Sequence, residues 1–64
     1  MSTFKERLIE EHEQLTDKII KLELFIPTPT FSTIKPIQQS LLKAQLFAMK
    51  TYSSILVERL KWLE

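Results

Sequence analysis

A single proline-bearing break divides this sequence into two halves that both favour helix. Pro27 and Pro29 stand two residues apart among β-branched neighbours. Each proline removes a backbone donor and biases the residue before it toward an extended conformation. Both flanking halves are rich in Leu, Lys, Glu, Gln and Ala, which are good helix formers, and neither half shows the period-2 alternation of a strand. The sequence therefore predicts an all-α fold, with residues 1–64 forming a single antiparallel helical-hairpin domain.

The first helix is expected over about residues 3–26, with Ser2 or Thr3 as its N-cap. A capping box needs a Glu or Gln three residues after the cap. Thr3-x-x-Glu6 supplies that acidic residue, whereas Ser2-x-x-Lys5 does not.

The second helix is expected over about residues 36–63. Pro36 is then its first residue, a position where a missing backbone N–H costs nothing. The proline-containing loop, residues 27–35, is long enough for the two helices to pack antiparallel. Phe31 and Ile34 are expected to cover the closed end of the hairpin.

Composition excludes several classes of protein. The 64 residues include no Cys and no Gly, which excludes disulfides, Cys-ligated zinc and Gly-rich phosphate loops. Nine Lys+Arg against eight Asp+Glu give a formal charge of +1, which argues against binding to DNA or RNA through a basic stripe. His12 is the only histidine, so we do not expect a metal site or an acid–base pair built on histidines. We also expect no cofactor.

The N-terminal segment is polar and carries charges of both signs. No apolar segment follows it, and no apolar run in the sequence is long enough to span a membrane. We expect a cytoplasmic protein with no membrane association.

Both helices carry more apolar surface than a hairpin can hide. The first helix has a heptad seam at Leu8, His12, Leu15, Ile19, Leu22 and Ile26. The second helix has an expected seam at Leu42, Gln45, Met49, Tyr52, Leu56, Arg59 and Leu63, with further apolar residues on both flanks. Two helices bury only one stripe each against one another. The surplus predicts a closed homo-oligomeric helical bundle, a tetramer or a hexamer.

Polar residues at seam positions are the candidates for function. Four of them are His12, Gln45, Tyr52 and Arg59. An antiparallel hairpin closed near residue 31 adds two neighbours from the first helix, so that its open half gathers Arg7, Glu11, His12, Gln45, Tyr52 and Arg59. One interpretation is structural, in which a buried Arg59–Glu11 pair and hydrogen-bonded Gln45 and Tyr52 fix register and assembly. The other is a pocket for a small anionic, aromatic ligand, since Arg binds phosphate bidentately and stacks on bases. The residues leave both interpretations open.

The sequence also resembles a family of short phage and prophage proteins, relatives of a crAss-like phage gene product. It is similar as well to the helical-hairpin domain of anti-CBASS and anti-Thoeris sponge proteins. The resemblance covers about residues 4–60, and its most specific part is the string Gln45, Met49, Tyr52 and Arg59. Its other matching residues are Glu6-Arg7-Leu8, Glu11, Leu15, Lys21-Leu22-x-x-Phe25-Ile26, Phe31, Gln39-x-Leu41-Leu42, Leu46, Ile55-Leu56 and Leu60.

This resemblance implies a phage anti-defence role without catalysis. Such sponges are homo-oligomers that sequester cyclic nucleotides or cyclic ADP-ribose isomers, the messengers that activate host immune effectors. It implies ligand contacts at Arg7, Gln45, Tyr52 and Arg59, whereas His12 stands where the family pattern has an aromatic residue.

Two other functions remain as alternatives. The apolar flank could grip a host or phage protein as a small helical interaction module. An enzyme acting on nucleotides is disfavoured, because no nucleophile–base pair or carboxylate dyad at helical spacing suggests catalysis.

Overall fold

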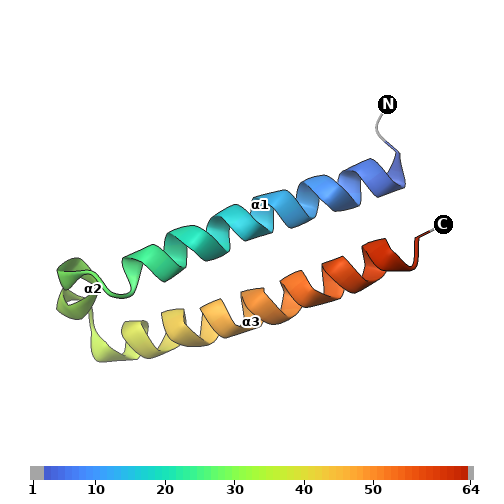
Figure 1. The fold of residues 1–64 in the computed structure, drawn as a ribbon. Helices are drawn as coiled ribbons and strands as arrows, with labels where there is room; N and C mark the ends of the chain where they lie inside the picture. The colour runs from blue at the N-terminus through green and yellow to red at the C-terminus, as the bar shows by residue number, and fades with distance from the viewer. Residues whose placement is uncertain (1–2, 64) are drawn as a thin grey trace.

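The computed structural model describes residues 3–63, which form an antiparallel helical hairpin (Figure 1). Helices α1 (Phe4–Phe25) and α3 (Pro36–Lys61) are its two arms, and a short helix α2 (Pro29–Thr33) joins them. The start of α1 and the end of α3 lie at the open end, and α2 lies at the closed end (Figure 1). The principal extents are 46 × 19 × 15 Å. The all-α hairpin predicted from the sequence is confirmed.

Helix α1 begins with the predicted Thr3 cap. The backbone N–H of Glu6 donates to Thr3 Oγ1 at 3.1 Å, and the Thr3 hydroxyl donates to Glu6 Oε1 at 3.2 Å. This satisfies one of the free N–H groups at the helix start. Helix α3 begins at Pro36, as expected, with Lys35 as its N-cap residue.

The connecting segment contains a helix that the sequence analysis did not predict. Thr28 caps α2 by accepting a hydrogen bond from the backbone N–H of Phe31 at 3.3 Å, and Pro29 stands in its first turn. A proline at the first position of a helix is unstrained. Pro29 can therefore begin a new helix, so the helix break between α1 and α2 is short. The expectation of a helix-free loop over residues 27–35 is wrong.

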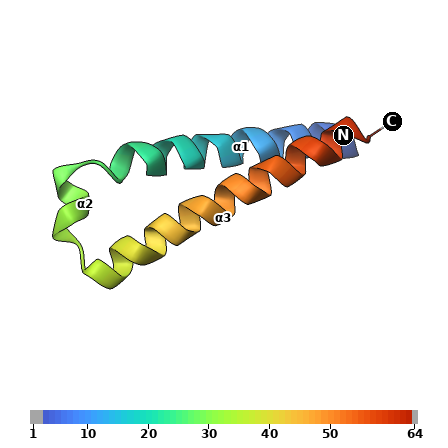
Figure 2. The same ribbon diagram turned by 60° about the horizontal axis from the view of Figure 1, so that its bottom comes forward.

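Phe31 closes the hairpin, as predicted. It is 5% exposed and packs edge to face on Phe25, with ring centroids 5.7 Å apart. Gln39 secures the same turn from α3, since its Nε2 donates to the carbonyl of Ile34 at 2.9 Å. Figure 2 shows α1 and α3 farther apart beside α2 than at the open end of the hairpin.

The core lies along the seam between α1 and α3. Its buried members are Leu8, Leu15, Ile19 and Leu56, packed against the partly buried Leu46, Met49, Leu60 and Leu63. On α1 the predicted seam is confirmed, since Leu8, Leu15 and Ile19 are its buried residues.

On α3 the seam is rotated relative to the prediction. Leu42, Met49, Leu56 and Leu63 face inward as expected, but the residues between them are Leu46, Ser53 and Leu60. Gln45, Tyr52 and Arg59, which were expected there, are exposed. The rotation places two partly buried leucines where the prediction had a guanidinium and an amide, which are costly to remove from water. The predicted seam was therefore wrong at three of its positions.

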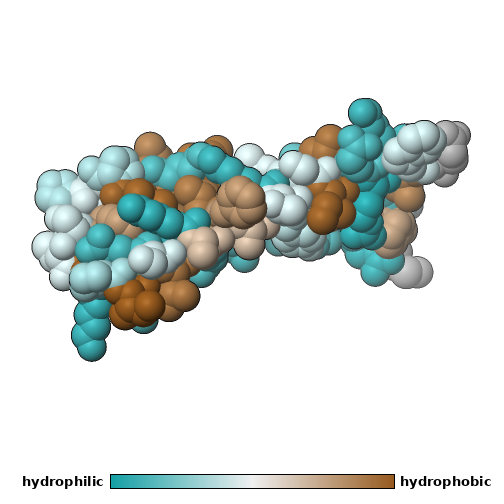
Figure 3. Space-filling model, turned by 90° about the horizontal axis from the view of Figure 1, so that it is seen from below, coloured by the Kyte–Doolittle hydropathy of each residue, from teal (hydrophilic) through white to brown (hydrophobic). Residues whose placement is uncertain are grey.

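The hairpin leaves large apolar side chains uncovered. Among those more than half exposed are Phe4, Leu24, Ile37, Leu41, Phe47, Ile55 and Trp62. Figure 3 views the molecule from the side along which α3 lies, and apolar patches interrupt its polar surface there. The surplus apolar surface expected from the sequence is present. Over residues 3–63, no helix has the combination of length and apolarity that crossing a bilayer requires.

Candidate ligand-binding site

A hollow of about 280 Å³ lies between the two arms at the open end of the hairpin. Its lining residues are Phe4, Arg7, Leu8 and Glu11 from α1 and Arg59 from α3. Leu8 is 3% exposed. It belongs to the buried core and also lines this hollow, so the hollow lies directly beside the core. We call this feature the inter-helix hollow.

Helical spacing explains why these α1 residues share the hollow. Residues three, four and seven apart lie on one face of a helix, and Phe4, Arg7 and Glu11 have this spacing. The antiparallel turn then brings the last part of α3 beside the start of α1. Arg7 and Arg59 line the same hollow, so the hairpin brings these two arginines together at its open end.

The guanidinium of Arg59 lies over the ring of Phe4, with 5.9 Å between Cζ and the ring centroid. Both side chains are exposed, so the guanidinium can still donate to a ligand. In the part of the chain described, the ion pairs are Lys21–Asp17, Lys50–Glu23 and Lys61–Glu58. The Arg59–Glu11 pair of the structural interpretation is not among them.

Gln45 and Tyr52 extend the same row of α3 away from the hollow. They precede Arg59 by two heptads and one heptad, and a heptad spans about 10.5 Å of helix. Tyr52 is 41% exposed, and Gln45 Nε2 lies 3.9 Å from Met49 Sδ. The row offers an amide, a phenol and a guanidinium along one line, but Gln45 and Tyr52 do not line the hollow itself.

His12 does not join the group in which it was expected. Its Nε2 lies 3.2 Å from Ser53 Oγ on α3, and both residues are partly buried in the seam. The sequence grouped His12 with the polar residues of the open half, and Ser53 was not among the expected site residues. Ser53 follows Met49 by four residues, and this spacing was the sequence signal that could have placed Ser53 on the inward face of α3.

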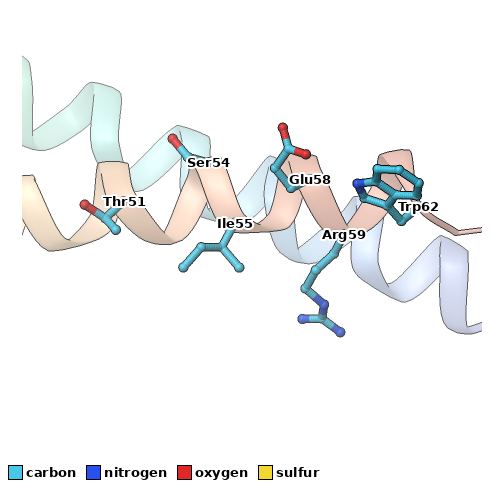
Figure 4. A pocket seen from close by; sticks show the side chains of 6 residues that line it. All are labelled: Thr51, Ser54, Ile55, Glu58, Arg59 and Trp62. Atoms are coloured by element: carbon cyan, nitrogen blue, oxygen red, sulfur yellow. The ribbon is translucent and has the colours of Figure 1, made fainter.

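A second, more open hollow of about 440 Å³ lies on α3 alone. Thr51, Ser54, Ile55, Glu58, Arg59 and Trp62 line it (Figure 4). Arg59 borders both hollows, so its side chain stands between the inter-helix hollow and this α3 groove. Phe4 was not among the expected site residues, and the α3 groove was not expected. The available signal was the presence of large apolar residues near the free ends of the two helices.

Acidic residues do not gather into a metal site here. The consecutive Glu10, Glu11, His12 and Glu13 point to different faces of α1. Within residues 3–63, no group of three or more His, Asp or Glu side chains is placed to hold a metal ion.

The fold and the hollow together define a small helical-hairpin protein with an arginine-lined site at its open end. Comparison with known sequences then places it: the chain belongs to the Sequestin family, whose sequence profile matches residues 2–62. It is similar to an uncharacterised 7.5 kDa protein from the denB–rIIB intergenic region of Enterobacteria phage T4. The two are 35% identical over 60 residues, which cover 94% of each chain. No solved structure matches the chain.

These matches confirm the resemblance to a family of small phage proteins. They do not bear on the relationship to crAss-like phages or to the hairpins of anti-CBASS and anti-Thoeris proteins, which stays a prediction.

Proposed function

We propose that the protein is a phage anti-defence sponge that sequesters a nucleotide second messenger in the cytoplasm of the host bacterium. The messenger would be a cyclic nucleotide or a cyclic ADP-ribose isomer, held without cleavage by a homo-oligomer of this chain. The observation that carries the proposal is the placement of Arg7, Arg59 and Phe4 around one hollow.

The chemistry of this hollow suits a nucleotide. A guanidinium presents a planar fork of donors that matches phosphate oxygens, and it also stacks on aromatic rings. Phe4 offers a ring face on which a base can stack, and Tyr52 offers a second ring one heptad farther along α3. Leu8 supplies an apolar floor. Glu11 is an acceptor for the amino groups of a base or the hydroxyls of a ribose.

The family and its phage relative support the same function. The name Sequestin points to sequestration, and the T4 protein belongs to a phage. Sequestration needs tight, reversible binding alone. The binding groups of the hollow supply this without any transfer of atoms.

Native mass spectrometry of the purified protein with a panel of nucleotides tests the proposal. The panel contains cyclic dinucleotides, cyclic trinucleotides and cyclic ADP-ribose isomers. We expect one class to bind at a fixed stoichiometry and to be released intact on denaturation. A folded protein that binds no member of the panel would contradict the proposal, and a released product of altered mass would show an enzyme instead.

Variants assign the binding to the inter-helix hollow. Arg7→Ala and Arg59→Ala should weaken the affinity measured by calorimetry. Lys21→Ala is the matched control, because Lys21 is a cation paired with Asp17 at 2.9 Å elsewhere on α1. Equal losses in all three variants would show a general effect of charge rather than a site.

A second candidate function is that of a protein-interaction module. The exposed Leu41, Ile55 and Trp62 of α3 favour it, because an apolar helix face is a common surface for gripping a partner helix. This candidate predicts a chain that stays monomeric until a host or phage protein is added. A nucleotide-binding oligomer formed by the chain alone would exclude it.

A further inference from the structure

Helix α3 has a second apolar seam that faces solvent. Six exposed residues, which we call the outer row, follow one another at heptad positions along the whole helix: Ile37, Leu41, Ala44, Ala48, Ile55 and Trp62. Thr51 and Glu58 occupy the two remaining positions of the repeat. Alternating steps of four and three residues are the pattern with which one helix packs lengthwise on another.

We infer that the outer row is the interface between two copies of this chain, with their α3 helices packed antiparallel. The inference deepens the proposed function, on which it rests for the expectation that several copies act together. The occupant is a second copy because the row is self-complementary, as a twofold interface must be.

The size of the exposed surface fits one partner of this kind. A folded monomer of 7.6 kDa is expected to expose about 4300 Å², whereas this chain exposes 5176 Å². The excess of roughly 900 Å² is close to the ~800 Å² that each partner buries in a stable interface of standard size.

Side-chain size and charge select the antiparallel orientation. With the twofold axis between Ala48 and Thr51, the small Ala44 of one copy faces Ile55 of the other. Ile37 then faces Trp62. These two residues are 62% and 81% exposed in the single chain, so each covers the other. A parallel arrangement would instead place Glu58 against its own copy, which is unfavourable.

The antiparallel arrangement also accommodates Glu58. Its aliphatic stem would lie against Leu41 of the second copy, and its carboxylate stays at the rim, 3.5 Å from Lys61 Nζ. Arg59 borders the α3 groove as well as the inter-helix hollow. A second copy covering the groove would therefore shield one side of Arg59 from water and strengthen its contacts with a phosphate.

Disulfide trapping tests the orientation, because the chain has no cysteine of its own. Ala44→Cys and Ile55→Cys are prepared separately and then mixed under mild oxidation. The antiparallel interface predicts a mixed disulfide between the two variants and little cross-linking of either variant alone. Val57→Cys is the control, since Val57 is 44% exposed on the opposite side of α3. Cross-linking of each variant with itself, or cross-linking of the Val57→Cys control alone, would overturn the inference.

Analytical ultracentrifugation tests the interface without oxidation. Ile55→Lys should raise the dissociation constant of the dimer by about thirtyfold or more, whereas Val57→Lys should leave it nearly unchanged. Circular dichroism confirms that both variants stay helical. A wild-type chain that is monomeric at micromolar concentration overturns the inference, as does a dimer that Ile55→Lys leaves intact. Calorimetry with the nucleotide panel is run on the wild type in parallel, so that a missing dimer and a missing ligand are recorded separately.

Discussion

The two ends of the hairpin contain the same contact in opposite surroundings. At the closed end Lys43 Nζ lies 5.9 Å from the ring centroid of Phe31, and at the open end Arg59 Cζ lies 5.9 Å from that of Phe4. Phe31 is 5% exposed and Phe4 is 54% exposed. The same pairing of a cation with a ring therefore serves the fold at one end and remains accessible to a ligand at the other.

The neighbours of each ring explain the difference. Phe31 has Phe25 packed at right angles to it and sits in a turn fixed by hydrogen bonds from Gln39. Phe4 is the first residue of α1 and has the inter-helix hollow beside it. A ring enclosed on several sides stabilises the fold, whereas a ring beside a hollow offers a surface for binding.

Replacing the two phenylalanines is the strongest test of this comparison. Phe31→Ala should lower the free energy of unfolding by about 3–5 kcal/mol, since it removes a buried ring and leaves a cavity. Phe4→Ala should cost about 1 kcal/mol or less, because much of its surface is already in water. Urea denaturation followed by circular dichroism measures both, and equal losses would contradict the proposed division of roles.

The two cations should differ in ligand affinity rather than in stability. Arg59→Ala should weaken binding of the tightest nucleotide in the panel by roughly 10–100-fold, the range expected for losing hydrogen bonds to a charged group. Lys43→Ala should leave that affinity unchanged. Isothermal titration calorimetry provides the measurement. An equal loss in Lys43→Ala would move the site away from the open end.

The two threonine caps offer a finer comparison. Thr3→Ala removes the cap of α1 and should cost about 1 kcal/mol, with faster amide hydrogen exchange near Phe4 and Arg7. Thr28→Ala removes the cap of α2 and should speed exchange near Phe31 instead. If Thr3→Ala leaves exchange at the open end unchanged, the cap does not hold the hollow in shape.

The ion pair between the arms should give the smallest effect. Lys50 Nζ lies 2.7 Å from Glu23 Oε2, with side chains 53% and 42% exposed. Exposed pairs contribute about 0–1 kcal/mol and are screened by salt. Glu23→Gln should therefore lower the unfolding midpoint slightly in low salt and not at all in high salt. A large loss that persists in high salt would show a role beyond charge.

Sequence reasoning predicted the hairpin because its signals are local. Prolines 27 and 29 break the helix wherever the rest of the chain lies, and the Thr3 cap needs only Glu6 nearby. Helix α2 could also have been predicted, since Thr28 before Pro29 is a helix start signal of the same kind.

The candidate site was predictable in part. The antiparallel turn was enough to bring Arg7, Glu11 and Arg59 to one end. It could not place His12, because that depended on which residues of α3 face α1.

The sequence by itself determined that the chain forms two apolar helices joined by one turn, with arginines near its open end. Only the tertiary structure decided how α3 is rotated. Leu42, Met49, Leu56 and Leu63 recur every seven residues. The inward-facing residue between two of them can stand either three positions after the first (Gln45, Tyr52 and Arg59) or four positions after it (Leu46, Ser53 and Leu60). Packing against α1 selects the four-residue spacing, because Leu46 and Leu60 then pack partly buried on the core and Ser53 lies beside His12. The three-residue spacing would have buried Gln45 and Arg59. Their removal from water costs free energy that no contact within a single hairpin offsets.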